Sequence, residues 1–356
     1  MSQPLDRLRE QMSSKNVDAA FVSDLLNVGW LTGFTGSSGF AIVTSEHSLF
    51  LTDSRYTIQA NEEVSGFDVR WYQRPKTFEE FAGECLADLG IKSIAFEPSI
   101  SYATWKSWGD KIGGVEWIDA PDLFKPLRMI KTPEEIALTR DVCGIADACC
   151  EYLRDRMQAG RSEFDVQLDL EFFLRRQGAE IAFDPIVVSG PNSAKPHGQA
   201  GDRALQEGDF VTLDLGARKA GYNSDITRTF VVGEPSDRHR EVYDQVLKAQ
   251  LAAIEALQPG TAAKDVDQLS RSILAEKDLD KYFGHGLGHG LGRAVHDYGG
   301  LGPTSTDTIE AGQVWTVEPG VYIEGFGGVR IEDDVHVTES GPELLTHYTK
   351  ELLVIG

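Results

Sequence analysis

Residues 210–232, FVTLDLGARKAGYNSDITRTFVV, decide the fold of the C-terminal half of this chain. Apolar residues dominate both ends, which predicts a strand on each side of a turn near Ala220-Gly221. Two aspartates interrupt the apolar runs, Asp214 and Asp225, and a hairpin would set them side by side. A charged side chain in a buried strand is costly unless it is paired or bound to a metal ion. Taken singly, each aspartate is better explained as a turn cap or an ion-pair partner.

Histidines gather in residues 283–292, FGHGLGHGLG, where glycines alternate with histidines and apolar residues. His285, His289 and the nearby His296 are three of the chain's eight histidines. The glycines let the backbone approach a ligand closely. A lone histidine is more often a hydrogen-bonded structural residue, but a cluster in a glycine frame favours a functional role.

Two further carboxylates end or follow strand-like segments. Glu318 closes the apolar segment 314–318, directly before a Pro-Gly turn. Glu332 lies in segment 328–337, two residues after Arg330, so both side chains would share a strand face. Arg330 could orient a carboxylate that binds a metal ion. For this segment alone, a surface Arg–Glu pair explains the pattern equally well.

Together these segments offer four carboxylates and one imidazole. Oxygen-rich donor sets with one nitrogen suit Mn²⁺, Co²⁺, Fe²⁺ or Zn²⁺. Without cations the carboxylates would repel one another. Two metal ions that share a bridging water would remove the repulsion and create a hydrolytic centre. The candidate ligands are Asp214, Asp225, His289, Glu318 and Glu332.

The length and charge of the chain restrict its organisation and partners. At 356 residues, two domains are expected, and we place them at 1–125 and 126–356, with a boundary turn at Asp119-Ala120-Pro121. The net charge of −22 argues against nucleic acid and anionic membranes as partners. No apolar run approaches the roughly 18 residues that span a bilayer.

The N-terminal segment MSQPLDRLREQM is charged and shows no signal-peptide pattern, so we expect a cytoplasmic protein. No cysteine pair has a CxxC zinc spacing, and we expect reduced, buried thiols in all four cases: Cys85, Cys143, Cys149 and Cys150.

The predicted fold class is α+β, with an α/β N-terminal domain. Helices are expected at 5–15, 132–158, 162–178, 238–257 and 265–277, and Thr132 and Glu135 form a candidate capping box at the second. Strands are expected at 19–22, 40–44, 48–52, 92–96, 186–189, 210–216, 222–232, 314–318 and 328–337. Strand runs flanked by long helices predict helices that cover one sheet face.

The order Asp-x₁₀-Asp, HGxGHxxG, EPG and RIED, across about residues 180–340, resembles the metal-dependent pita-bread peptidases. That family includes methionine aminopeptidase, aminopeptidase P and prolidase. The N-terminal segments 27–39, NVGWLTGFTGSSG, and 51–56, LTDSRY, resemble the creatinase/prolidase-like non-catalytic domain of its proline-specific members. The resemblance therefore implies that domain followed by a pita-bread catalytic domain.

The resemblance also implies residue roles. Asp214 and Asp225 would bind one metal ion, with Asp225 bridging. His289 and Glu318 would complete the second site, and Glu332 would bridge both. His197 would contact the substrate, and His285 and His296 would hydrogen-bond the scissile carbonyl and the tetrahedral intermediate. Arg330 would support Glu332, and Glu318 would also act as the acid–base carboxylate.

The implied function is hydrolysis of the Xaa-Pro peptide bond with two divalent ions, Mn²⁺ first, with Co²⁺ or Zn²⁺ as alternatives. Residues 34–39 and 296–299 favour aminopeptidase P, which releases the residue before proline from longer peptides. The alternative is a prolidase restricted to dipeptides, in which Arg293 could bind the substrate carboxylate. A non-catalytic binding protein and a creatinase-like hydrolase are disfavoured, because they lack the full ligand set.

The expected partners are small proline-containing peptides. The resemblance also suggests a homodimer, for which Trp30 or Trp71 could supply an exposed aromatic contact, although a core role fits them as well.

Overall fold

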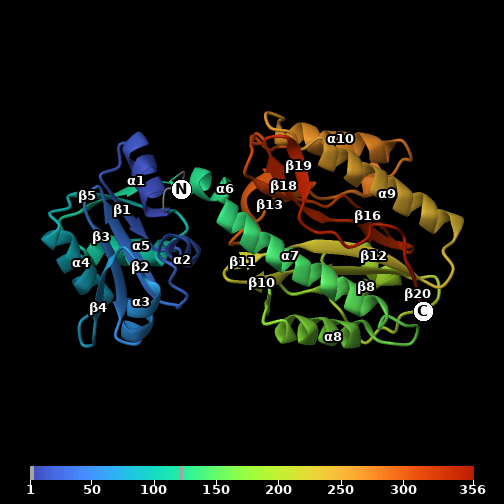
Figure 1. Cartoon of the computed structure of the whole chain (residues 1–356), viewed down its shortest axis with the longest axis horizontal. Helices are drawn as coiled ribbons and strands as arrows, with labels where there is room; N and C mark the ends of the chain where they lie inside the picture. The colour runs from blue at the N-terminus through green and yellow to red at the C-terminus, as the bar shows by residue number, and fades with distance from the viewer. Residues whose placement is uncertain (1–3, 121–122) are drawn as a thin grey trace. The chain divides into compact units, whose positions relative to one another are not determined.

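A computed structural model describes residues 4–120 and 123–356 (Figure 1). The turn expected at Pro121 and the first three residues of the charged N-terminal segment therefore lie outside the described residues. The chain forms two compact units, Met1–Arg128 and Met129–Gly356.

The first unit is built on a six-stranded mixed sheet. Its order is β4 (Asp68–Tyr72), β3 (Ser48–Asp53), β2 (Gly39–Thr44), β1 (Ala19–Val22), β5 (Ser93–Phe96) and β6 (Glu116–Asp119). The antiparallel pairing of β2 with β3 confirms the hairpin predicted from the sequence. The helices are α1 (Pro4–Ser14), α2 (Leu25–Thr32), α3 (Thr57–Glu63), α4 (Phe78–Asp88), α5 (Tyr102–Lys111) and α6 (Lys125–Met129).

Aromatic residues dominate the core of this unit. Phe21 on β1 packs edge-on against Trp108 of α5 and Trp117 of β6, with ring centroids 5.0 and 5.5 Å apart. Trp30 is buried at 6% exposure, whereas Trp71 is 47% exposed. Of the two tryptophans considered for a dimer contact, only Trp71 has a substantially exposed side chain.

Among its described residues, the second unit contains two larger sheets, each with its own pair of helices (Figure 1), a three-stranded sheet of order β11-β10-β7 and the two-stranded pair β16-β17. The four-stranded sheet has the order β20 (Val354–Ile355), β12 (Ile226–Val232), β9 (Phe210–Leu215) and β8 (Ile186–Ser189). The five-stranded sheet has the order β14 (Asp297–Leu301), β13 (Gly288–Gly290), β15 (Val314–Val317), β18 (Asp333–Thr338) and β19 (Gly341–Leu344). Shorter strands are β7 (Glu180–Ile181), β10 (Ala217–Lys219), β11 (Tyr222–Asn223), β16 (Gly320–Ile323) and β17 (Gly327–Arg330).

Helices α7 (Pro133–Arg154) and α8 (Glu163–Arg176) share a core with the four-stranded sheet. Helices α9 (Asp237–Glu255) and α10 (Ala263–Ala275) share another core with the five-stranded sheet. The capping box at the start of α7 forms as predicted, through Thr132 and Glu135, but the helix ends at Arg154, four residues early. The α+β prediction is confirmed.

Two strands predicted as continuous are broken. Segment 222–232 divides into β11 and β12, and segment 328–337 divides into β17 and β18. The breaks contain Asp225 and Glu332. The backbone N–H of Asp225 donates to the Asp334 carboxylate at 2.9 Å, and that of Glu332 donates to the Thr227 carbonyl at 3.1 Å. Each break therefore turns a carboxylate out of the strand without leaving its amide unpaired.

Across residues 4–120 and 123–356, no helix combines the length and apolar character that a membrane crossing requires. The four cysteines are free and buried, as expected.

Candidate metal centre

The hairpin of residues 210–232 places its two aspartates on one face of the sheet. Asp214 on β9 pairs with Thr227 on β12, and Asp225 lies two residues before Thr227. Asp225 is thus a diagonal neighbour of Asp214, within reach of the same ligand. The turn lies where it was predicted, and both Ala220 and Gly221 have positive φ angles, 51° and 81°.

Glycines hold His289 between two neighbouring strands. A Cβ atom on Gly288 would lie 2.0 Å from the Thr316 carbonyl oxygen of β15. One on Gly290 would lie 2.0 Å from the Tyr298 carbonyl oxygen of β14. Side chains at these positions would force the strands apart, so the glycines allow β13 to carry the imidazole into the site.

The imidazole of His289 presents a lone pair to the carboxylates. Its Nδ1 lies 3.1 Å from the Gly290 carbonyl oxygen, which can only accept, so Nδ1 carries the proton in this assignment. Nε2 then faces Asp225 Oδ2 at 3.6 Å and Glu318 Oε1 at 3.5 Å. Burial, reinforced by the nearby His296, lowers the pKa of His289 to about 4, which keeps the ring neutral. A neutral imidazole with a free Nε2 is the form that binds metal ions.

Glu318 and Glu332 reach the same point from strand ends. Glu318 directly follows β15, and Glu332, 2% exposed, accepts a hydrogen bond from Thr227 Oγ1 at 2.6 Å. Burial raises the pKa of Glu318 to about 8. Burial and neighbouring carboxylates raise the pKa values of Asp225 and Glu332 well above their ordinary range. These shifts arise because several acidic groups face one another in a buried site.

Asp214 has one oxygen paired and one open. Its Oδ2 pairs with Arg330 Nη2 at 2.5 Å. Its Oδ1 is buried and has no hydrogen-bond partner among the described residues. A buried carboxylate oxygen without a partner is costly, so a cation at this position would supply the missing interaction.

Arg330 supports Glu332 through an intermediate hydroxyl. Its Nε donates to Thr227 Oγ1 at 3.1 Å, and that hydroxyl donates to Glu332. The sequence predicted that Arg330 supports Glu332. In the structure the guanidinium also contacts Asp214 directly, so it orients both carboxylates.

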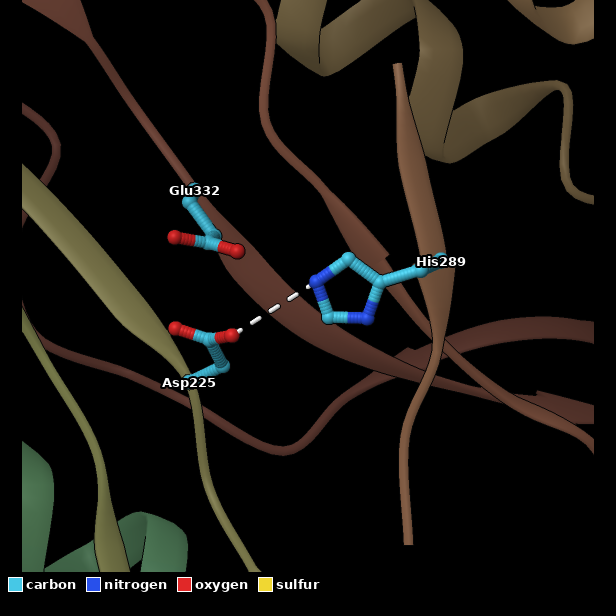
Figure 2. Close-up of side chains that lie close together, drawn as sticks. All are labelled: Asp225, His289 and Glu332. Carbon is cyan, nitrogen blue, oxygen red and sulfur yellow. Dashed lines mark ion pairs between the residues drawn. The ribbon is translucent and has the colours of Figure 1, made fainter. Parts of the chain in front are cut away.

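Asp225, His289 and Glu332 form the tightest group (Figure 2). Their ligand atoms lie within 4.8 Å of one another, and the three side chains come from separate segments of the chain. One nitrogen and two carboxylates at this spacing, with Asp214 and Glu318 adjacent, fit divalent cations. The donor set and the open oxygen of Asp214 therefore both suit a metal centre.

A cavity of about 560 Å³ contains the cluster. It is bordered by every residue that the sequence proposed for the site: Asp214, Asp225, His289, Glu318, Glu332, His197, His285, His296 and Arg330. His197 and His296 have exposed side chains, and the His296 ring lies 4.2 Å from that of His289. Segments more than a hundred residues apart thus meet at one point.

The sequence did not reveal Tyr322. Its hydroxyl lies 2.8 Å from Arg330 Nη1 and 2.9 Å from His285 Nε2, and it borders the cavity. His285 Nδ1 lies 2.8 Å from the Gly286 carbonyl oxygen, which can only accept, so Nδ1 carries the ring proton. Nε2 therefore accepts a hydrogen bond from the Tyr322 hydroxyl. A tyrosine in a β-strand is common, and no local pattern distinguishes this one.

The Arg293 side chain packs against the hairpin. Its guanidinium carbon lies 5.5 Å from the Tyr222 ring centroid, beside the β10–β11 turn. It is absent from the described residues that border the cavity. The expectation that Arg293 binds a substrate carboxylate stays a prediction, because the described contacts of this side chain are with the hairpin.

Comparisons with known proteins identify a metallopeptidase family and its N-terminal domain in this chain. Residues 137–339 match the model of metallopeptidase family M24, and residues 4–130 match the creatinase/prolidase N-terminal domain. A Xaa-Pro dipeptidase of Pyrococcus furiosus is 37% identical, over 99% of this chain and 100% of its own.

Two solved structures share the whole architecture. A Xaa-Pro dipeptidase from Bacillus anthracis aligns with a TM-score of 0.95 and 38% identity, over 99% of each chain. An X-Pro aminopeptidase from Thermotoga maritima aligns with a TM-score of 0.91 and 35% identity, also over 99% of each chain. With a creatinase-type α/β domain followed by a pita-bread catalytic domain, this chain belongs to metallopeptidase family M24.

Proposed function

We propose that this metallopeptidase hydrolyses the Xaa-Pro peptide bond with two divalent metal ions, and that Xaa-Pro dipeptides are its main substrates. The observation that carries the proposal is the convergence of Asp225, His289 and Glu332 within 4.8 Å, beside Asp214 and Glu318. The dipeptidase names of the relatives from Pyrococcus furiosus and Bacillus anthracis support this substrate class. They support it better than the aminopeptidase that the sequence alone favoured.

The aminopeptidase is the second candidate, because the Thermotoga maritima protein named X-Pro aminopeptidase covers the same length at 35% identity. Arg293, the residue offered as a dipeptide-specific carboxylate ligand, contacts the Tyr222 ring, so its binding to a substrate carboxylate stays a prediction. Substrate length therefore has to be measured.

The proposed ligands are Asp214 and Asp225 for one ion, His289 and Glu318 for the other, and the bridging residues Asp225 and Glu332. When bound, the two ions supply Lewis-acid chemistry that acidifies a shared water and polarises the peptide carbonyl. Glu318, which borders the cavity, would serve as the acid–base group and hold a proton at its carboxylate. It can then return the proton to the proline nitrogen that leaves.

Other residues of the cavity bind and orient the substrate. His197 and His296, with exposed side chains, would donate hydrogen bonds to the substrate and to the developing oxyanion. Both ring nitrogens of His285 have partners, the Gly286 carbonyl and the Tyr322 hydroxyl at 2.9 Å, so His285 would act on the substrate side of the cavity through Tyr322. Arg330 would hold Asp214 and, through Thr227, Glu332.

The preference for proline has a physical basis in the cavity. Proline brings no amide N–H, so the site need not supply an acceptor at that position. Phe183 and Ile186 border the cavity with apolar surface that can contact the ring. A substrate with alanine in place of proline would bring an N–H that this surface leaves unpaired.

The proposal is tested with Gly-Pro, Gly-Pro-Ala and Gly-Ala after reconstitution of the chelated protein with Mn²⁺. We expect cleavage of Gly-Pro, slower cleavage of Gly-Pro-Ala, no cleavage of Gly-Ala, and loss of all activity on renewed chelation. Faster turnover of the tripeptide would establish the aminopeptidase instead. Absence of chelator-sensitive cleavage would favour a binding protein, and chelator-insensitive creatine turnover would favour a creatinase-like hydrolase.

Mn²⁺ stays the first choice over Co²⁺ and Zn²⁺ as a prediction, because all three suit these donors. The homodimer and the cytoplasmic location also stay predictions.

A further inference from the structure

A buried carboxylate outside the metal cluster contacts the segment that carries His197. Glu163 is the first residue of α8, and its side chain is only 1% exposed. The segment it contacts, residues 189–201, begins at the end of β8, includes a 3₁₀ turn at Gly190–Ala194, and supplies Pro196 and His197 to the cavity wall. Because the His197 side chain is exposed, little packing fixes it. Its place in the cavity therefore depends on the backbone of this segment.

Glu163 joins the two ends of that segment. Its Oε1 accepts hydrogen bonds from the backbone N–H and the hydroxyl of Ser189, at 2.6 and 2.8 Å. Its Oε2 accepts from Asn192 Nδ2 at 3.0 Å and from the backbone N–H of Gly201 at 3.2 Å. A carboxylate offers about four acceptor sites, so all of them are used here. Hydrogen bonds to an ionised acceptor are roughly twice as strong as neutral ones.

Other contacts fix the middle of the segment against the site. Ser193 Oγ accepts from the backbone N–H of Gly328 on β17 at 2.9 Å. Arg330 Nη1, whose guanidinium also holds Asp214, donates to the Pro196 carbonyl at 3.3 Å. Glu163 closes the ends of segment 189–201, while these two bonds align its centre with the metal cluster.

We infer that Glu163 is a positioning residue: it holds segment 189–201 in the conformation that presents His197 to the substrate. The inference rests on the proposed function, in which His197 contacts the peptide. Glu163 itself lines no part of the cavity among the described residues, so it acts through the segment.

A purely structural role for Glu163 makes different predictions. A carboxylate in the first turn of a helix is favourable wherever it lies, because it meets the positive end of the helix dipole. Its loss would then lower global stability and leave the segment and the kinetic contribution of His197 unchanged. The decisive measurements are therefore local exchange and kinetic coupling.

The first experiment measures amide hydrogen exchange in the metal-free protein. This measurement does not depend on enzymatic activity. In Glu163→Gln, only the amide oxygen can accept, so the side chain can keep the pair of bonds from Ser189 or the pair from Asn192 and Gly201, but not all four. We expect exchange in peptides covering 189–201 to accelerate by about tenfold or more. The control is Glu171→Gln on the same helix, whose carboxylate accepts from Gln167 and should leave the segment unchanged. Equal exchange in Glu163→Gln and wild type would overturn the inference.

The second experiment is a double-mutant cycle with His197→Ala, read as kcat and KM on Gly-Pro. We expect Glu163→Gln to lower kcat/KM by about tenfold or more in the wild-type background, since small misplacements of a positioned group are costly. In the His197→Ala background the same change should cost less than about twofold, because the group it positions is gone. The same factor in both backgrounds would overturn the inference.

If Glu163→Gln does not fold, Asn192→Ala takes its place, because it removes one donor to Glu163 and the bond from Nδ2 to the Gln199 carbonyl. The same exchange and kinetic criteria then decide. Failure of the proposed function would be distinct: wild type would cleave no Xaa-Pro peptide, while the exchange measurement would still support or overturn the role of Glu163 in ordering the segment.

Discussion

Glu318 shows how one residue couples the metal centre to stability. Burial raises its pKa from 4.5 in the unfolded chain to about 8 in the metal-free fold. A raised pKa in the folded state means that folding favours the protonated acid. The resulting stability is fully present below about pH 4.5 and is lost as the pH rises to about 8, at up to about 1.4 kcal/mol per pH unit.

Glu318→Gln removes this titration. In the chelated protein, we expect the variant to gain free energy of unfolding relative to wild type as the pH rises from 5 to 8. Urea denaturation at several pH values measures the difference. Glu171→Gln, which removes the same charge from α8 outside the cavity, should run parallel to wild type. Parallel profiles for Glu318→Gln as well would show that Glu318 is not buried against its neighbours as described.

The sequence marked Asp214, His289 and Glu318 as ligand candidates because each interrupts an apolar or glycine-rich segment. Asp214 interrupts the run FVTLDL, and His289 lies in a run of alternating glycines. Tyr322 and Glu163 carry no such mark. A tyrosine belongs in a strand, and a glutamate belongs in the first turn of a helix, so their contacts follow only from the tertiary structure.

At the element scale, the approach of β13 to β15 places the imidazole. Gly288→Ala would put a Cβ atom 2.0 Å from the Thr316 carbonyl oxygen, a distance that requires the strands to separate. We expect His289 to move with β13 and Mn²⁺ affinity to fall by about tenfold or more. Metal titration of the chelated variant measures this. Gly284→Ala is the matched control, because its Cβ would meet open space. Equal affinities in the two variants would contradict this account of the strand.

Strand positions follow well from the hydrophobic pattern, whereas strand continuity does not. The β-strand patterns on either side of Asp225 and Glu332 join 222–232 and 328–337 into single predicted strands. The breaks depend on hydrogen bonds from distant segments: the Asp334 carboxylate takes the Asp225 amide, and the Thr227 carbonyl takes the Glu332 amide. A local sequence pattern cannot predict hydrogen-bond partners that lie far away in the chain.

At the scale of the whole molecule, the two units should respond differently to metal. The proposed ligands all lie in Met129–Gly356. Tryptophans report mainly on the other unit, which contains five of the six: Trp30, Trp71, Trp105, Trp108 and Trp117. Tryptophan fluorescence therefore follows the first unit, apart from the contribution of Trp315, and far-ultraviolet circular dichroism follows both.

Mn²⁺ at about 100 times its dissociation constant should stabilise the second unit by about 2.7 kcal/mol, because the unfolded chain lacks the assembled site. We expect the circular dichroism melt to gain a component shifted upward by several degrees, while most of the fluorescence melt stays in place. Asp225→Asn should abolish the shift, since it removes a proposed bridging ligand. An equal shift in both signals would mean that the units unfold as one cooperative block. The metal would then stabilise even the aromatic core around Phe21, which contains none of its ligands.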